Sequence, residues 1–361
     1  MKKLAFRSSL ALLAVIFLAV GCAPPEITSA RLYIRNKDWP SARASLEQAL
    51  QQYPDNAEAH KLMADVELQA RNWEAARDHY RAAERLGTPQ MKQQVEQIME
   101  GQWVQQYNIA VSMLNRGDHQ RAIELFEIAT KLIPERTPAW NNMAICYAQI
   151  DSIDMAIAMY NQVLVLEPDN RDVRKNIGFM YFNNQEYEKA VEYLQVVADE
   201  DISDGSVVSA LGVCYVQLER KQEALALYER AIEADPDNVE VLFNLAFLYV
   251  QEGNDELALP YLLRLIEADP FDGEAMQQIG FIYMNVDEPT QEDLDRAFPY
   301  LLKASELNPN NFITWRFLGM YYIRSGDLEK GREAMNRADQ LEELQGGDPP
   351  PTTPPTIPPV R

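Results

Sequence analysis

The feature that most constrains the fold of this chain is a pattern of residues that recurs with a period of 34 positions. One copy of the pattern consists of Trp140, Ala144, Tyr147, Ala156, Tyr160 and Pro168. Another copy, two periods later, consists of Gly212, Tyr215, Ala224, Tyr228, Ala231 and Pro236. A fixed period of this size indicates stacked structural units rather than one closed core. Apolar residues three and four positions apart predict two helices in each unit, so the expected fold class is all-α.

Nine copies of the pattern can be placed in one register. They span residues 23–56, 57–90, 103–136, 137–170, 171–204, 205–238, 239–272, 273–311 and 312–345. Inserts of 12 and 5 residues complete the assignment of residues 23–345. Small residues at positions 8, 20 and 27 of a unit let the helices approach, and large residues at 4, 7, 11 and 24 fill the space between them. The longer insert, residues 91–102, is polar and helix-prone, so it is predicted to join units two and three as one helix and to interrupt the stack there.

This register resembles the tetratricopeptide repeat (TPR) family, which has Trp or Leu at position 4, Gly or Ala at 8, Tyr at 11, Ala at 20 and Pro at 32. The resemblance covers residues 22–345 and implies a right-handed superhelical solenoid of about nine helix-turn-helix units. Solenoids of this kind bind proteins on a concave wall, which is formed mainly by the first helix of each unit. The resemblance therefore implies protein–protein interaction rather than catalysis.

Positions 2, 5, 9, 12 and 13 of a TPR unit face the concave groove, and in this chain several of them are apolar. The predicted partner-binding groove consists of Tyr107, Val111, Ile145, Phe179, Phe182, Val213, Phe243, Phe247, Phe281, Met284 and Met320. An exposed apolar strip of this kind indicates a docking site for a peptide or an amphipathic helix. The alternative is that neighbouring first helices bury much of position 9. TPR chaperone adaptors bind carboxylates with Lys at position 5 and Asn at position 9, whereas Lys175 is followed here by Phe179, so that activity is not expected.

The first 21 residues have the composition of an export signal. Three basic residues precede an apolar run at residues 10–20, which is too short to span a bilayer comfortably. The sequence Ala-Val-Gly before Cys22 resembles the bacterial lipobox, which implies that Cys22 is lipidated and anchors the chain to a membrane. Because Ala23 follows Cys22 where inner-membrane lipoproteins carry Asp, the resemblance implies the outer membrane, facing the periplasm. An ordinary signal peptide or an uncleaved anchor is the alternative.

Charge is distributed unevenly along the chain. Residues 23–90 carry 9 basic and 10 acidic residues, whereas residues 186–308 carry 7 basic and 27 acidic residues. Such an acidic surface excludes nucleic acid as a partner and favours a basic amphipathic helix or peptide. The tail, residues 346–361, contains seven Pro and is predicted to be an extended, disordered linker, with a ligand for a Pro-recognising module as the alternative.

No pattern typical of a catalytic, cofactor or metal site occurs in the chain. The three histidines, His60, His79 and His119, have no metal-ligand spacing with one another or with cysteine, and no HExxH, Gly-rich phosphate loop or GxSxG is present. Cys146 and Cys214 fall at the same position of units four and six, so they are interpreted as small buried residues without a disulfide. We therefore expect no enzyme activity and no cofactor.

The main functional hypothesis is a lipid-anchored TPR scaffold of the cell envelope that binds one or more protein partners. The alternative is an adaptor or capture module for an envelope enzyme or a saccharide-synthesis complex. A third interpretation, a cytoplasmic TPR adaptor, would require that Cys22 carries no lipid.

Overall fold

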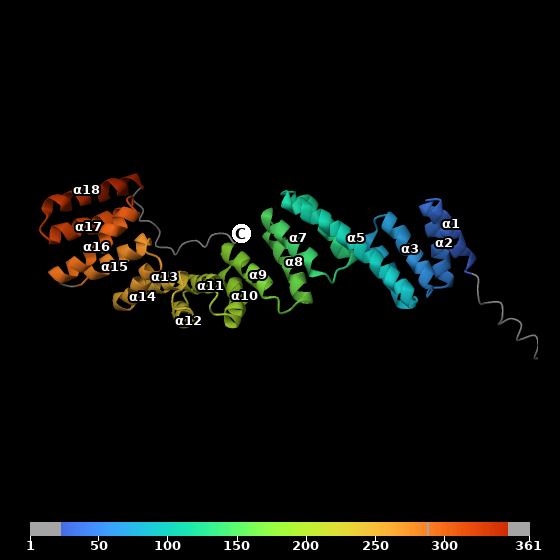
Figure 1. The fold of residues 1–361 in the computed structure, drawn as a ribbon, viewed down its shortest axis with the longest axis horizontal. Coiled ribbons are helices and arrows are strands. Elements are labelled where there is room, and N and C mark those ends of the chain that lie inside the picture. Colours follow the sequence, from blue (N-terminus) through green and yellow to red (C-terminus); the bar gives the residue numbers. More distant parts are fainter. Residues whose placement is uncertain (1–22, 287–288, 346–361) are drawn as a thin grey trace, which may run out of the picture. The chain divides into compact units, whose positions relative to one another are not determined.

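The computed structural model describes residues 23–286 and 289–345, and these residues form eighteen α-helices and no strand (Figure 1). The predicted lipidation site Cys22, the signal segment 1–21 and the Pro-rich tail 346–361 lie outside the described residues. The helices are α1 (Pro25–Arg35), α2 (Trp39–Gln52), α3 (Ala57–Gln69), α4 (Trp73–Leu86), α5 (Pro89–Asn115), α6 (His119–Leu132), α7 (Thr137–Gln149), α8 (Ile153–Leu166), α9 (Arg171–Asn183), α10 (Tyr187–Glu200), α11 (Gly205–Gln217), α12 (Lys221–Ala234), α13 (Val239–Gln251), α14 (Asp255–Ala268), α15 (Gly273–Met284), α16 (Gln291–Leu307), α17 (Phe312–Arg324) and α18 (Leu328–Leu344).

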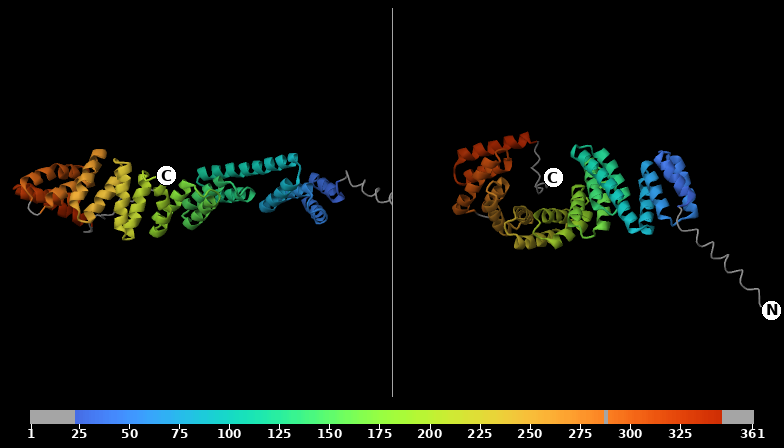
Figure 2. Two further views of the ribbon diagram at one scale, coloured as in Figure 1. Left: turned by 90° about the horizontal axis from the view of Figure 1, so that it is seen from below. Right: turned by 45° about the vertical axis from the view of Figure 1, so that its right-hand side comes forward.

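The chain divides after Asn170 into two compact halves, an N-terminal half with α1–α8 and a C-terminal half with α9–α18. Within each half, consecutive helices fold back on each other as pairs, and each pair packs on the next (Figures 1 and 2). The predicted fold class, an all-α solenoid of helix pairs, is confirmed. No helix among residues 23–286 and 289–345 combines the length and apolar character needed to cross a membrane.

The turn inside each unit has the same backbone geometry throughout the described part of the chain. Its residue at position 15 lies in the left-handed region in eight units, and these residues are Lys37, Arg71, Gly117, Asp151, Gln185, Glu219, Gly253 and Gly326. The next residue donates its N–H to the carbonyl of position 11, as in Asp38 to Tyr33 (2.9 Å). This is the hydrogen-bond pattern that ends helices with a left-handed residue. The bond fixes the turn even where a side chain at position 15 makes that conformation cost about 1–2 kcal/mol.

Close contact between a small residue at position 8 and a large residue at position 24 holds the two helices of a unit together. In unit six, Gly212 on α11 faces Tyr228 on α12, whose side chain is 1% exposed. A Cβ atom at Gly212 would lie 2.1 Å from Cζ of Tyr228. Gly178 faces Leu194, and Gly280 faces Leu301, in the same way. Because these large side chains are buried, a methyl group at any of these three glycines would require the facing side chain to move.

The insert at residues 91–102 is helical and forms part of α5, as predicted. Val95 and Met99 are buried against Tyr80 of α4, and one turn further along α5, Trp103 is buried in the cluster that contains Phe126 of α6. An apolar residue at every fourth position therefore continues the core through the insert. For this reason the chain does not divide at the insert, and it divides instead after Asn170.

Cys146 and Cys214 are free thiols, and both are buried. Burial raises the pKa of Cys146 to about 11 and that of Cys214 to about 12, so neither thiol is reactive at neutral pH. Their interpretation as small core residues is confirmed.

His60 and His79 form a direct contact inside unit two, with their Nδ1 atoms 2.9 Å apart. Nε2 of His60 lies 2.8 Å from the Pro54 carbonyl oxygen, which can only accept a hydrogen bond. Nε2 of His60 therefore donates, and Nδ1 of neutral His60 accepts from Nδ1 of His79. The indole N–H of Trp140 donates to the Pro134 carbonyl at 2.8 Å in the equivalent place. His60 thus takes the structural role of the position-4 tryptophan.

Replacing Gly212 by alanine should destabilise the C-terminal half by roughly 1–3 kcal/mol, because the new methyl group overlaps the buried ring of Tyr228. The matched control is Gly101→Ala in α5, where a Cβ atom meets nothing within 4 Å. That substitution should stabilise the chain by up to about 1 kcal/mol, because alanine is the better helix former. Urea unfolding followed by circular dichroism measures both changes, and equal effects of the two substitutions would contradict this account of the helix crossing.

Acidification should destabilise the N-terminal half through the histidine pair. Burial, followed by the neighbouring His60, lowers the pKa of His79 below 6.5, while Glu67 and Asp78 oppose this shift. As the pH falls through about 6.5, the unfolded chain binds more protons than the folded chain, so stability present at neutral pH is lost. We expect the thermal midpoint to fall less in His79→Gln, because the glutamine amide still donates to His60 and does not titrate. His119→Gln, which leaves the pair intact, should keep the wild-type pH dependence.

A candidate interaction surface in the C-terminal half

The predicted groove residues differ widely in exposure. Phe179 and Met284 are 5% and 4% exposed, and Met320 is 36% exposed. The remaining eight are partly buried. Phe179 is buried because it packs in the core cluster of the C-terminal half, and the ammonium of Lys175 lies 5.7 Å from its ring centroid. Met284 packs against α16 and α17 in the cluster that contains Leu294, Leu301 and Leu318. Phe179 and Met284 are therefore core residues and are not available to a partner.

Tyr107 and its neighbours in the N-terminal half are held by contacts within the chain. The ring of Tyr107 stacks on Trp103 with centroids 4.6 Å apart, and its hydroxyl accepts a hydrogen bond from Asn142 at 2.9 Å. Val111 packs against the same cluster as Tyr107. The hydrogen bond from Asn142 links α7 to α5, and Tyr107 and Val111 are partly buried.

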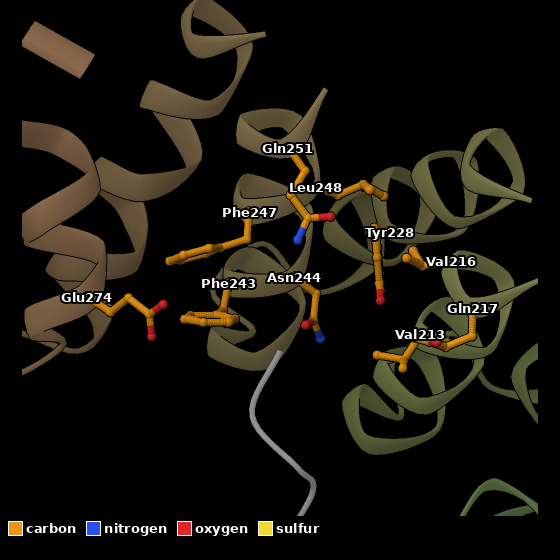
Figure 3. Close-up of a pocket in the computed structure, with 10 residues that line it drawn as sticks. All are labelled: Val213, Val216, Gln217, Tyr228, Phe243, Asn244, Phe247, Leu248, Gln251 and Glu274. Atoms are coloured by element: carbon orange, nitrogen blue, oxygen red, sulfur yellow. The ribbon is translucent and has the colours of Figure 1, made fainter. Parts of the chain in front are cut away.

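Three predicted residues, Val213, Phe243 and Phe247, line one hollow in the C-terminal half (Figure 3). The hollow has a volume of about 470 Å³, including space open to solvent. Its lining comes from the first helices α11, α13 and α15, together with Tyr228 of α12. The remaining lining residues are Val216, Gln217, Tyr228, Asn244, Leu248, Gln251 and Glu274. The sequence-based prediction therefore located three of the apolar lining residues and missed the polar side chains.

Phe243 and Phe247 form the aromatic wall of the hollow. They lie four residues apart on α13, so their side chains leave the same face of the helix. Their ring centroids are 4.2 Å apart with an interplanar angle of 22°, and both rings are only partly buried. The pair therefore presents an aromatic surface that is fixed by stacking.

Glu274, near the start of α15, supplies the only carboxylate among the lining residues. Figure 3 shows its carboxylate directed toward the two phenylalanine rings. Desolvation, followed by the charge of Asp272, raises the pKa of Glu274. Desolvation also raises the pKa of Asp272, which caps α15 by accepting from the Ala275 N–H at 2.8 Å. Among residues 23–286 and 289–345, no Lys or Arg forms an ion pair with Glu274, so its negative charge is uncompensated.

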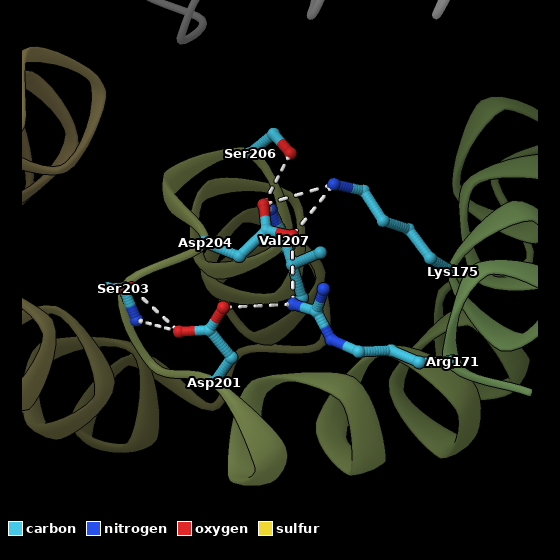
Figure 4. A network of polar contacts seen from close by, with 7 residues as sticks. All are labelled: Arg171, Lys175, Asp201, Ser203, Asp204, Ser206 and Val207. Carbon is cyan, nitrogen blue, oxygen red and sulfur yellow. Dashed lines mark hydrogen bonds and ion pairs between the residues drawn. The ribbon is translucent and has the colours of Figure 1, made fainter. Parts of the chain in front are cut away.

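A separate polar network lies at the start of the C-terminal half (Figure 4). Nζ of Lys175 lies 2.8 Å from Oδ2 of Asp204, and Arg171 bonds the same carboxylate at 3.0 Å. Burial opposes ionisation of Asp204, but the hydrogen bonds from Lys175 and Ser206 outweigh it and lower the pKa. Asp204 also caps α11 by accepting from the Val207 N–H. Asp204 thus neutralises Lys175 within the chain. For this reason Lys175 is not available to bind a carboxylate of a partner.

No group of three or more His, Cys, Asp or Glu side chains in the described parts of the chain is arranged to hold a metal ion. The Asp204 network pairs its charges within the chain, whereas the hollow presents two partly buried rings and a carboxylate without an ion pair among the described residues.

Three segments of the chain match sequence profiles of the tetratricopeptide repeat, namely residues 27–90, 137–170 and 215–279. No curated protein sequence matches the chain.

Several solved structures are similar to parts of the chain. MamA from the strain MSR-1 is 27% identical over 48% of this chain and 98% of its own, with a TM-score of 0.41. YrrB, described as a TPR protein with an unusual peptide-binding site, is 23% identical over 52% of this chain and 95% of its own, with a TM-score of 0.43. PilF of Pseudomonas aeruginosa is 18% identical over 61% of this chain and 97% of its own, with a TM-score of 0.46.

Proposed function

We propose that this chain, a tetratricopeptide-repeat protein by its sequence matches and its helix pairs, is a lipid-anchored scaffold that binds a protein partner in the cell envelope. TPR units are protein-interaction modules, and their first helices form the binding wall. The proposal adds two elements to this general role, the binding site in the C-terminal half and the anchor at Cys22.

The observation that supports binding most directly is the hollow between α11, α13 and α15. Its stacked phenylalanine rings are partly exposed, and the carboxylate of Glu274 lies beside them without a counter-ion. An apolar surface next to an uncompensated charge is costly to leave in water and favours a complementary partner. The partner that fits is an amphipathic or extended peptide segment with apolar and basic side chains.

The anchor rests on the N-terminal sequence. A basic start, an apolar run at residues 10–20 and the Ala-Val-Gly-Cys sequence ending at Cys22 are typical of a bacterial lipoprotein signal. Several acyl chains on one cysteine give durable attachment, whereas a single chain binds a membrane only marginally. A periplasm-facing outer-membrane position is the destination that the Ala residue after Cys22 favours.

Replacing Phe247 by glutamate should abolish capture of the partner from solubilised envelope by the purified lipidated protein. The substitution puts a second negative charge beside Glu274 and removes one ring of the stack. The matched control is Phe271→Glu, since Phe271 is 76% exposed and does not line the hollow. Circular dichroism establishes that both variants are folded. Partner recovery that is equal for Phe247→Glu and wild type would refute binding in the hollow.

Replacing Cys22 by serine should release the protein from the membrane fraction and prevent incorporation of radioactive palmitate, because serine offers no thiol for acylation. Cell fractionation and lipid labelling measure the two effects. A wild-type protein that takes up no label, or a serine variant that remains in the membrane fraction, would rule out anchoring through this residue without affecting the assignment of the binding surface.

A further inference from the structure

We propose that the hollow binds the guanidinium group of an arginine side chain in the partner, stacked on the phenylalanine pair and paired with Glu274. This inference rests on the proposed binding role of the hollow and specifies the chemistry that the hollow recognises. Three independent features of the described residues support it.

The first feature is an arrangement that the chain uses three times within itself. Arg136 lies over the Trp103 ring at 4.5 Å and pairs with Glu100. In the second example, Arg220 lies over the Tyr215 ring and pairs with Glu223. In the third, Arg316 lies over the Phe312 ring and pairs with Glu342. Their guanidinium-to-centroid distances are 4.6 Å and 5.4 Å. In each case a planar cation satisfies an aromatic face and a carboxylate together.

The hollow contains the same two acceptors without the arginine. The stacked rings of Phe243 and Phe247 correspond to the aromatic face, and the carboxylate of Glu274 is directed toward them (Figure 3). Within the described residues, neither ring has a cation over it, and Glu274 has no ion pair. The missing member of the arrangement is therefore a guanidinium that the described residues do not supply.

The second feature is the lack of a spare cation near the hollow. Between residues 205 and 284 the chain has 4 basic and 14 acidic residues. Three of the four basic side chains are already engaged, because Arg220 pairs with Glu223, Lys221 pairs with Glu252, and Arg264 donates to the Pro236 carbonyl. None of the four lines the hollow. The region therefore attracts a basic ligand and contains no residue that competes for Glu274.

The third feature is a set of amide groups around the rings. The side chains of Asn244 and Gln217 line the hollow and form no hydrogen bond with the described residues. Their carbonyl oxygens can accept from the N–H groups that a guanidinium does not direct at Glu274. A guanidinium has five donors in one plane, so it can stack on a ring while it donates at its edge. An ammonium group has three donors and no flat face, so lysine fits this lining less well.

The test begins with linear random peptides displayed on phage and selected on the folded mature chain. Peptides are kept when their binding is lost in Phe247→Glu and retained in Phe271→Glu. We expect the kept peptides to share an arginine next to apolar residues. One such peptide is then synthesised with arginine, with lysine, and with citrulline, which has nearly the same shape as arginine and no charge.

Fluorescence anisotropy gives the affinity of each synthetic peptide. We expect citrulline to weaken binding to the wild-type chain by about 30-fold, which corresponds to roughly 2 kcal/mol for a desolvated cation–π pair. In Glu274→Gln the preference for arginine over citrulline should shrink but not vanish, because the ion pair is lost while the cation–π contact with the rings remains. The control Glu256→Gln removes the same charge from an exposed site on α14, outside the hollow, and should keep the preference for arginine.

The outcomes separate this inference from the function on which it rests. If the kept peptides lack arginine, or if citrulline binds the wild-type chain as tightly as arginine does, the guanidinium site is refuted while binding in the hollow stands. If no selected peptide depends on Phe247, the proposed binding role and the guanidinium site are refuted together.

Discussion

The whole architecture depends on how closely the two helices of a unit approach each other. At the crossing in unit six, the backbone at Gly212 leaves no room for a methyl group beside the buried ring of Tyr228. Glycine at the same position of units five and eight meets Leu194 and Leu301 in the same way. This contact sets the spacing within a pair, and the stacking of pairs then places successive first helices side by side. The hollow exists because α11 and α13 are held at this spacing, so that their position-9 and position-13 side chains border one space.

The fold could be predicted from the sequence because the helix crossing requires particular residue sizes at fixed positions, and these sizes recur every 34 residues. The turns could be predicted only in part. Glycine marks the left-handed residue in three units, whereas Lys37, Arg71, Asp151, Gln185 and Glu219 occupy the same place without a turn signal. Their conformation follows from the hydrogen bond that closes the helix, and the backbone makes that bond with any side chain.

The groove could be predicted less well, because exposure at position 9 depends on the neighbouring helices and not on the residue itself. Phe179 and Phe247 occupy the same position of their units, yet Phe179 is buried in the core and Phe247 lines the hollow. Lys175 was not expected to bind carboxylates because Phe179 follows it, and the structure adds a second reason, since Asp204 at the end of the same unit pairs with it. Glu274 stands at a position known to face the groove, but a search for apolar residues passes over it. The relevant sequence signal was a polar residue at a groove position rather than another hydrophobic one.

The electrostatic character of the C-terminal half follows from how its few cations are used. Two of its arginines, Arg220 and Arg316, lie over aromatic rings and beside glutamates, so each one neutralises a carboxylate and covers an apolar face at the same time. With 7 basic and 27 acidic residues between positions 186 and 308, most carboxylates must remain without such a partner. Most of them are exposed, where water solvates the charge at little cost. Glu274 is exposed as well, but neighbouring protein removes part of its water, as the raised pKa of its carboxyl indicates, and two aromatic rings line the same hollow. A cation from a partner would gain more there than at carboxylates that are fully hydrated and have no aromatic ring beside them, so the proposed binding favours the hollow over the rest of the acidic surface.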